Sequence, residues 1–203
     1  MLMDGQLLHY DLVERHHILV AASREHTCQA MRDTDFVRVV IPVAQSVLEM
    51  RDIPRSIREI VQRVRHIPPD TTFTLADAVA GSFVPLGERR GRAIMIGAIG
   101  KLWKPEITFL PLEPAEFRAF HEPKYAKLAA AFWVERYGRD KSVLRFEARV
   151  TATDDSARAH LRRWYRVVRP FTALFMRALL ASIKADAEAL VTPSLAQTAP
   201  FSP

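Results

Sequence analysis

The last third of the chain constrains the fold most, because it carries one long amphipathic helical pattern. Asp154 or Asp155 is a natural N-cap, and the apolar residues that follow step by three or four as far as about Leu190. They are Leu161, Trp164, Val168, Phe171, Phe175, Leu179, Ile183 and Leu190. Such a helix is roughly 50 Å long, so its apolar stripe requires an extended apolar surface to pack on. Pro170 removes one backbone donor, and we expect a kink or break there.

Two strand patterns immediately before this helix supply that surface. Residues 127–137 and 143–153 alternate in polarity on either side of the turn GRDKS. The apolar members are Leu128, Ala130, Phe132 and Val134 on the first strand, and Leu144, Phe146, Ala148 and Val150 on the second. Matching these faces predicts an antiparallel pair with Glu135 near Arg145, and Trp133 near Glu147, on the opposite, charged face. The apolar face and the helix stripe would then form one core.

The remaining elements are short. The sequence predicts a strand over 10–20, a helix after the N-cap Ser23, helices over 35–50 and 54–66, a short helix after Thr74, strands over 82–88 and 92–100, an extended stretch over 101–112 and a short helix over 113–120. The sequence Arg-Arg-Gly at 89–91 predicts a hairpin turn between the strands over 82–88 and 92–100. The order predicts an α+β protein.

Gly97, Gly100 and Lys101 superficially suggest a phosphate-binding loop. That loop has the form G-x-x-x-x-G-K-[ST] before a helix, but this chain has Met95 and Leu102 at the first glycine and hydroxyl positions. We therefore interpret the two glycines as strand glycines that mark a bend, a bulge or a close approach to the backbone.

Composition indicates a single globular domain with a core. The chain has 203 residues, of which 49% are hydrophobic and 26% charged, and its net charge of +6 favours anionic partners such as lipid head groups, nucleic acid or an anionic ligand. One cysteine, Cys28, excludes an intrachain disulfide, and no signal-peptide core or membrane span is evident. These features predict a cytoplasmic protein.

The sequence predicts three regions. They are an N-terminal arm over residues 1–9, one domain over 10–190 and a flexible tail over 191–203.

The titratable residues form no recognisable catalytic or metal-binding motif. His16 and His17 are neighbours on a strand, so they point to opposite faces, and we favour one packed and one solvated histidine over a metal site. Cys28 is best interpreted as a buried structural thiol.

One strand face carries three charged residues, Glu147, Arg149 and Lys127. They would form a polar anchor for a ligand or an acid/base pair. Alternatively, they would form a solvated ladder of cross-strand ion pairs. We favour the ladder, and we expect no metal and no cofactor.

A row of arginines on the C-terminal helix has two interpretations. Arg158, Arg162, Arg163, Arg166 and Arg169 would touch membrane phosphates or nucleic acid, or would form a solvated helix face. No nucleic-acid motif accompanies them, so we expect no nucleic-acid partner and favour the solvated face. Transient contact with an anionic membrane surface stays open.

The order of elements resembles the helix-grip fold of the START-like, or polyketide-cyclase-like (SRPBCC), superfamily, and in particular a bacterial branch of it. The segments that carry the resemblance are FVPLGERRGRAIMIGAIGKLWKP, YAKLAAAFWV and LRFEARVTATDDSARAHLRRWYRVVRP, within a similarity that covers roughly residues 10 to 190. The resemblance implies a curved antiparallel sheet of about six or seven strands around the C-terminal helix. It also implies a cavity between them that in many members holds an apolar molecule.

From this resemblance we expect the protein to bind or carry a small hydrophobic or amphipathic ligand, lipid-like or polyketide-like. The alternatives are a cyclase, aromatase or dehydratase acting in the same cavity, and an interaction protein that docks through its basic helix. The expected ligand-binding residues are Phe83, Met95, Gly97, Trp103, Phe132, Phe146, Ala148, Trp164, Val168 and Phe171. Any one of the aromatic residues could equally be plain core. The sequence does not define the ligand or the oligomeric state.

Overall fold

The computed structural model describes residues 7–51, 53–68, 70–104 and 106–191. Along the chain the elements are β1 (Leu12–Val20), α1 (Arg24–Asp33), α2 (Phe36–Leu48), α3 (Arg55–Arg65), α4 (Leu75–Asp77), the π-helical turn η2 (Ala78–Ser82), β2 (Val84–Arg89), β3 (Ala93–Gly100), α5 (Pro114–Ala119), β4 (Ala126–Arg136), β5 (Ser142–Ala152) and α6 (Asp155–Ala189). The predicted α+β class is confirmed, and the element order follows the sequence prediction closely.

The described sheet has five strands, in the order β1-β5-β4-β3-β2, and every neighbouring pair is antiparallel. The expectation of six or seven strands is therefore wrong. The missing strand is the extended stretch 101–112, which turns away from the sheet directly after β3. A backbone hydrogen bond of 2.9 Å from Lys104 to Lys101 closes that turn, and one isolated bridge joins Gly100 to Phe109. Pro111, which lacks an N–H, cannot contribute a donor to a longer ladder.

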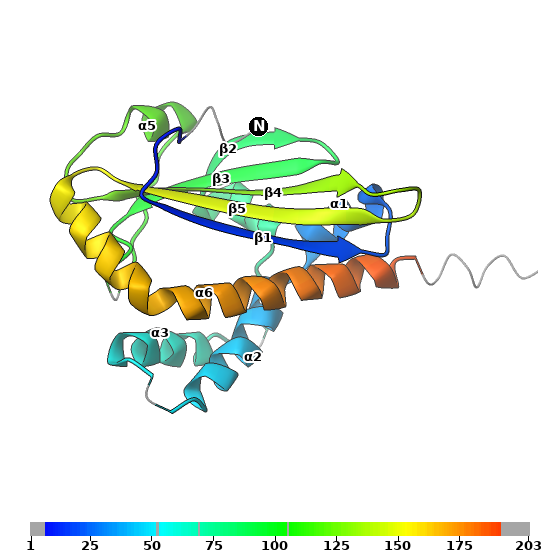
Figure 1. Cartoon of the computed structure of the whole chain (residues 1–203), viewed down its shortest axis with the longest axis horizontal. Helices are drawn as coiled ribbons and strands as arrows, with labels where there is room; N and C mark the ends of the chain where they lie inside the picture. Colours follow the sequence, from blue (N-terminus) through cyan, green and yellow to red (C-terminus); the bar gives the residue numbers. More distant parts are fainter. Residues whose placement is uncertain (1–6, 52, 69, 105, 192–203) are drawn as a thin grey trace, which may run out of the picture.

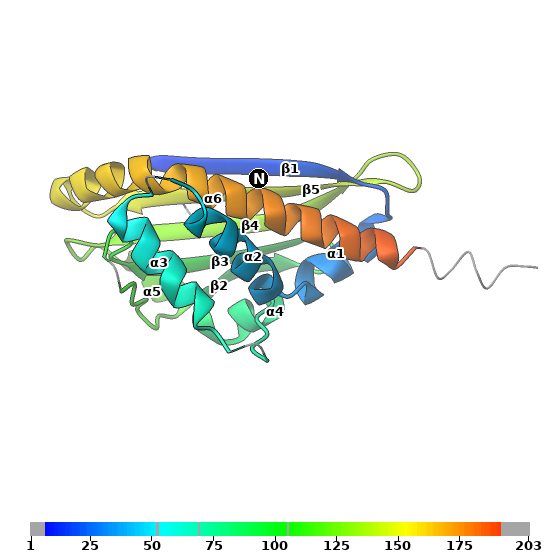
Figure 2. The ribbon, with the colours of Figure 1, turned by 90° about the horizontal axis from the view of Figure 1, so that it is seen from below.

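The helices lie on both faces of the sheet, but unequally (Figures 1 and 2). We name the two faces after the helices that cover them. The α6 face carries Phe132 and Phe146 and is covered by α1, α4 and α6, with α2 and α3 further out. The α5 face carries Ala131 and Glu147 and is covered in part by α5. On its own face α6 runs beneath β1 and β5 rather than beneath the middle of the sheet.

The α6 face forms the main core as the sequence predicts. Phe132 lies opposite Phe146 across β4 and β5, with 4.7 Å between the ring centroids, and the two residues are 3% and 7% exposed. Leu179 and Ile183 of α6 are buried in the same cluster. The apolar stripe departs from the prediction at its end, because Leu190 is exposed and Ala187 provides the last buried position.

Helix α6 begins after the N-cap Asp154, whose side chain accepts from the Ala157 N–H at 2.8 Å. It continues through Pro170 to Ala189 without interruption. Figure 1 shows that the helix changes direction between its yellow and orange parts. The helix therefore bends but does not break, and Pro170 lies within it.

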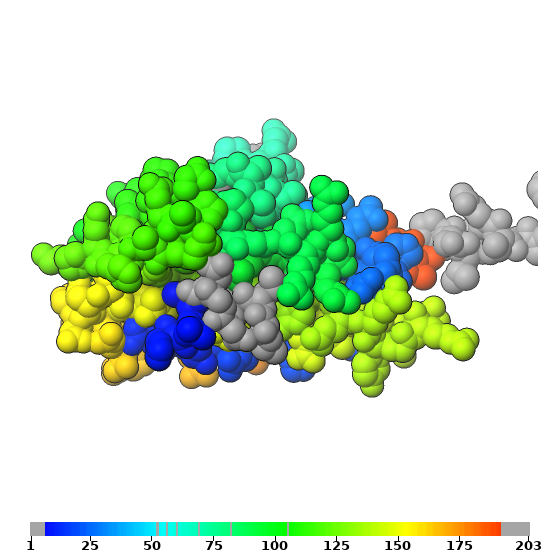
Figure 3. Space-filling view, turned by 90° about the horizontal axis from the view of Figure 1, so that it is seen from above, coloured from blue at the N-terminus to red at the C-terminus, as the bar shows by residue number. Residues whose placement is uncertain are grey.

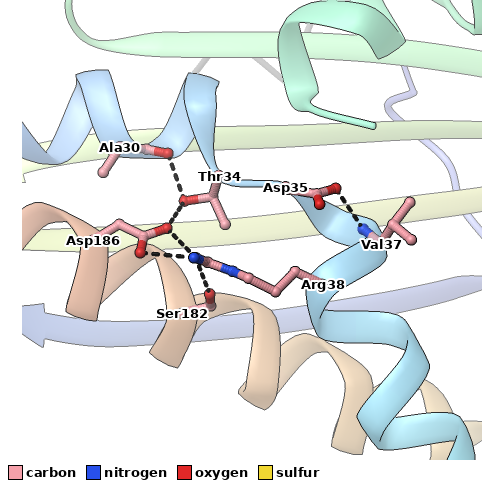
Figure 4. Close-up of polar contacts among 7 residues, drawn as sticks. All are labelled: Ala30, Thr34, Asp35, Val37, Arg38, Ser182 and Asp186. Carbon is pink, nitrogen blue, oxygen red and sulfur yellow. Dashed lines mark hydrogen bonds and ion pairs between the residues drawn. The ribbon is translucent and has the colours of Figure 1, made fainter. Parts of the chain in front are cut away.

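A polar junction attaches the first two helices to the C-terminal half of α6 (Figure 4). Asp186 accepts from the Thr34 hydroxyl at 2.8 Å and from Nη2 of Arg38 at 2.6 Å. The same Arg38 nitrogen also contacts the Ser182 hydroxyl at 3.2 Å. Asp35 caps α2 by accepting from the Val37 N–H at 2.9 Å. These contacts fix the path of the chain from α1 into α2 over the surface of α6.

Candidate functional site

The structure divides the predicted ligand-binding residues between the two faces of the sheet. Phe132, Phe146 and Ala148 lie on the α6 face, where the expected cavity would be. Met95 and Gly97 pair with Ala131 and Ala129 and face the other side. These last two residues therefore do not lie between the sheet and the C-terminal helix, because a side-chain period of two places them opposite Ile94 and Ile96.

Gly97 and Gly100 mark close packing, one of the roles considered for them. A Cβ on Gly97 would lie 2.7 Å from Cδ1 of Leu86 and 2.8 Å from the ring of Phe117. A Cβ on Gly100 would lie 2.9 Å from the carbonyl oxygen of Thr108. Gly97 thus allows α5 to pack against the sheet, and Gly100 allows the chain to fold back after β3.

The other predicted residues occupy three separate places. Trp103 stacks on His160 with 5.7 Å between the ring centroids, next to the start of α6. Val168 is buried against α2 and α3, and Trp164 and Phe171 pack against the same cluster. Phe83 contacts the ring of Phe109, with centroids 5.5 Å apart. Several of these residues therefore join helices or loops to one another.

Three polar side chains converge on the α6 face where α6 passes β1. The carboxylate of Glu14 accepts a hydrogen bond from the Tyr165 hydroxyl through one oxygen. Its other oxygen lies 3.2 Å from Nε2 of His16. The Glu14 and His16 side chains are only 19% and 13% exposed. This group was not predicted from the sequence, although residues 14, 16 and 18 share a face of the predicted first strand.

The hydrogen bonds to Glu14 bear on the tautomer of His16. When Glu14 is ionised it can only accept, so the Tyr165 hydroxyl donates to one oxygen and Nε2–H of His16 donates to the other. Burial raises the pKa of the Tyr165 phenol, and the hydrogen bond to Glu14 raises it further, so the phenol stays protonated at neutral pH. The neutral form of His16 consequently has its lone pair on Nδ1. Within the described ranges Nδ1 has no protein partner.

A hollow of about 280 Å³ lies beside this group, between the outer strand β1 and α6. Its lining is Arg15, His16, His17, Ile18, Arg177 and Leu180. His16 thus connects the polar group to an open volume of mixed basic and apolar character. His17 is exposed and belongs to the opposite face, so the prediction of one packed and one solvated histidine is confirmed.

The α5 face contradicts the prediction of a solvated ion-pair ladder. Glu147, Arg149 and Lys127 are 4%, 6% and 7% exposed, because α5 and the segment before β1 cover them. Figure 3 shows this face, with the green segment that contains α5 and the blue first described residues lying over it. Leu7, which we assigned to an N-terminal arm, is itself buried here.

Each of these buried charges has partners. Nε of Arg149 donates to Glu147 at 2.6 Å, and its Nη1 donates to the carbonyl of Leu7 at 3.0 Å. Arg15 donates to the other Glu147 oxygen at 2.9 Å. Burial acts to raise the pKa of Glu147, but the hydrogen bonds from Arg15 and Arg149 hold it below its usual value. Burial lowers the pKa of Lys127, whose amine donates to two carbonyls at the end of α5.

The remaining predicted features are structural or untested. Cys28 is buried, and burial raises the pKa of its thiol to about 11. The arginines of α6 differ in their surroundings. Arg158 and Arg162 approach Asp11 at 2.7 and 3.7 Å, whereas Arg163, Arg166 and Arg169 are exposed.

The described residues contain no group of three His, Cys, Asp or Glu placed to hold a metal ion. No described helix is both long and apolar enough to cross a membrane.

Comparison with known proteins gives only distant similarities. No protein-family profile and no curated protein matches the chain. A solved structure of a hypothetical protein from Helicobacter pylori aligns over 88% of this chain and 89% of its own, with 12% identity and a TM-score of 0.39. The Zhui aromatase/cyclase from Streptomyces sp. R1128 aligns over 89% of this chain and 95% of its own, with 16% identity and a TM-score of 0.31. These scores are too low to assign an activity.

Proposed function

We propose that this protein binds a small amphipathic ligand in the hollow between β1 and α6, with the polar end of the ligand on Nδ1 of His16. The observation that carries this proposal is the imidazole of His16, which is held through Nε2 by Glu14 and lines the hollow with its other nitrogen unpartnered within the described residues. Small-molecule sites combine apolar walls with a few fixed polar groups. Here Ile18 and Leu180 supply apolar wall, and His16 supplies the fixed polar group.

A dansylated long-chain alcohol tests this function, because its hydroxyl can donate to Nδ1 of His16 and its fluorescence reports transfer into an apolar site. Titration of the parent protein should give saturable binding, and His16→Gln should weaken it up to about ten-fold, as loss of one well-placed hydrogen bond predicts. Tyr165→Phe should weaken it less, because Glu14 would still hold the imidazole.

An exposed histidine outside the hollow provides the control. His121→Gln removes an exposed imidazole that does not line the hollow and should leave the affinity unchanged. Equal losses in the two variants, or no effect of His16→Gln, would contradict the proposal. Denaturant unfolding of both variants separates lost binding from lost structure.

A second candidate function, proton transfer on the bound ligand, is favoured by one feature of the same group. A carboxylate that holds one imidazole nitrogen leaves the other oriented as a general base, and Tyr165 keeps that carboxylate in place. The corresponding reaction class is proton abstraction next to a carbonyl. This function requires more than binding, because the ligand carbon that loses its proton must lie within reach of Nδ1 of His16.

A small β-ketothioester in heavy water tests the catalytic candidate by NMR. The parent should accelerate deuterium exchange at the carbon between the two carbonyls. His16→Gln should lower the protein-dependent rate by about 10²-fold, and His121→Gln, which lies outside the hollow, should not. Exchange no faster than in buffer alone would eliminate this candidate and leave the binding function to be judged on the fluorescence titration.

A further inference from the structure

A second hollow, of about 350 Å³, lies at the end of the sheet where β4 extends beyond β3. Ala93, the first residue of β3, pairs with Trp133, and β4 continues to Arg136. The N–H of Val134 donates to the carbonyl of Arg92 at 2.8 Å, which fixes the β2–β3 turn beside the extension. This hollow is separate from the His16 site, because its residues come from α1, β4, β5 and the β2–β3 hairpin rather than from β1 and α6.

Charged side chains dominate the lining. The charged members are Arg24, Arg89, Arg92, Arg136, Glu135 and Glu147. Both carboxylates already have cationic partners outside the hollow. Glu135 accepts from Nε of Arg145 at 2.8 Å, and Glu147 accepts from Arg15 and Arg149 at 2.9 and 2.6 Å. Each carboxylate is therefore paired with arginines that do not line the hollow, but the two negative charges remain at its rim.

The four lining arginines, in contrast, have few acidic partners. Arg24 and Arg136 both contact the same oxygen of Glu25, at 3.1 and 3.0 Å. No ion pair of Arg89 or Arg92 occurs among the residues that the structure describes. Nε of Arg24 is buried and has no hydrogen-bond partner in the described structure. The hollow consequently has a surplus of guanidinium donors, which bind carboxylates in a planar, two-point geometry.

An aromatic side chain lies next to these donors. The half-buried indole of Trp133 donates through Nε1 to Glu135 at 3.1 Å, which restrains its orientation. Ala93, its partner on β3, and Ala131, two residues earlier on β4, share its face, and both are small and buried. A flat apolar group can therefore lie beside the indole, since neither neighbour extends far from the sheet.

We propose that this hollow binds a small aromatic carboxylate, with its ring against Trp133 and its carboxylate on Arg89 and Arg92. Glu135 and Glu147 favour a monoanion, because they would repel the second charge of a phosphate monoester. The site fits the positive net charge of the chain without requiring a macromolecular partner. It does not depend on the function proposed for His16.

1-Naphthoate is a suitable probe, because it quenches tryptophan fluorescence and carries one carboxylate on a flat ring. Titration of the full chain should give saturable quenching that is lost in Trp133→Phe, which retains Trp103 and Trp164. Arg92→Gln should weaken binding about ten-fold, and adding Arg89→Gln should weaken it further. 1-Naphthalenemethanol, which has the same ring without the charge, should bind weakly to the parent and equally to both variants.

Arg90→Gln is the matched control, since Arg90 is in the same hairpin and carries the same charge but does not line the hollow. It should leave the affinity for 1-naphthoate nearly unchanged. The proposal is overturned if Arg90→Gln weakens binding as much as Arg92→Gln, which would indicate diffuse attraction by positive charge. It is also overturned if the parent does not bind 1-naphthoate, or if 1-naphthyl phosphate binds more tightly. His16→Gln should have no effect, so failure here is distinguishable from failure of the first proposal.

Discussion

The two faces of the sheet hold their charged side chains at different depths. On the α6 face the interacting pair Glu14 and His16 lies on the outer strand β1, next to a hollow, while the centre of the sheet is apolar. On the α5 face Glu147 and Arg149 lie on β5 and Lys127 lies on the central strand β4, all three buried. A charge at an edge regains water when it loses its partner, whereas a charge at the centre does not. The same type of substitution should therefore cost more stability on the α5 face.

The largest effect should follow Glu147→Gln. This change removes the Glu147 carboxylate from the buried guanidinium of Arg149 and from Arg15. We expect a loss of about 3 kcal/mol in the free energy of unfolding, because removal of one partner of a buried ion pair is strongly destabilising. The bond from Arg149 to the Leu7 carbonyl would persist and limits the loss. Urea unfolding measures this value, and a loss below that of Tyr165→Phe would contradict the comparison.

The same variant should show a defined pH dependence. The pKa of Glu147 is lower in the folded protein than its unfolded value of about 4.3. The carboxylate therefore stabilises the fold at pH values above about 4.3, and this stabilisation disappears as the pH falls through the folded-state pKa. The difference between the parent and Glu147→Gln should be constant from pH 6 to 7 and should shrink below pH 4. A difference that grows on acidification would contradict this assignment.

Gly97→Ala should have the next largest effect. The new Cβ would overlap Leu86 and Phe117, so α5 or the β2 side chain must move. Overpacking of this kind costs about 2 kcal/mol. Gly81→Ala is the control, because nothing lies within 4 Å of a Cβ at that position. Similar thermal midpoints for the two variants would show that the packing of α5 over Gly97 is loose.

Tyr165→Phe tests the α6 face and should cost about 1 kcal/mol. It removes one hydrogen bond to Glu14, but the carboxylate retains His16 and some access to water. Chemical denaturation at pH 7 measures the change. A loss equal to that of Glu147→Gln would show that the edge of the α6 face is as sealed as the centre of the α5 face.

Arg145→Gln should have the smallest effect, although it lies on the same strand face as Glu147. Its guanidinium pairs with Glu135 at 2.8 Å, but both side chains are well exposed. Exposed pairs contribute about 0.5 kcal/mol. A loss above 1 kcal/mol would show that this end of the α5 face is covered more fully than the described residues indicate.

The sequence predicted the elements with strong periodicity. Alternation over 127–137 and 143–153 assigned the correct faces to both strands, and the 3.6-residue period located α6 almost to its last residue. Glu135 approaches Arg145 as predicted, but Trp133 lies directly opposite Arg145 rather than Glu147. Alternation specifies the face of a residue more reliably than its partner, since diagonal neighbours share that face.

The covering of the α5 face could not be predicted in the same way. A period of two shows that Glu147 and Arg149 are opposite the apolar face, and polar residues there usually face water. Their burial depends on α5 and on Leu7, which approach from distant parts of the sequence. Met95 and Gly97, expected to line a cavity between the sheet and the helix, lie on the α5 face instead, and the sequence could not show this for a related reason. β3 is buried along its whole length, so its apolar pattern does not distinguish one face from the other.

The single cysteine has a practical consequence for studying both hollows. Cys28 is packed in the main core, and at neutral pH its thiol remains protonated because its pKa is about 11. Alkylating reagents act on the thiolate at accessible positions, so the native chain should resist them while it is folded. A cysteine introduced at an exposed position such as Arg90 would then be the one site that accepts a maleimide fluorophore. The natural sequence is thus already a suitable background for attaching a single spectroscopic label next to the hollow formed by the β2–β3 hairpin.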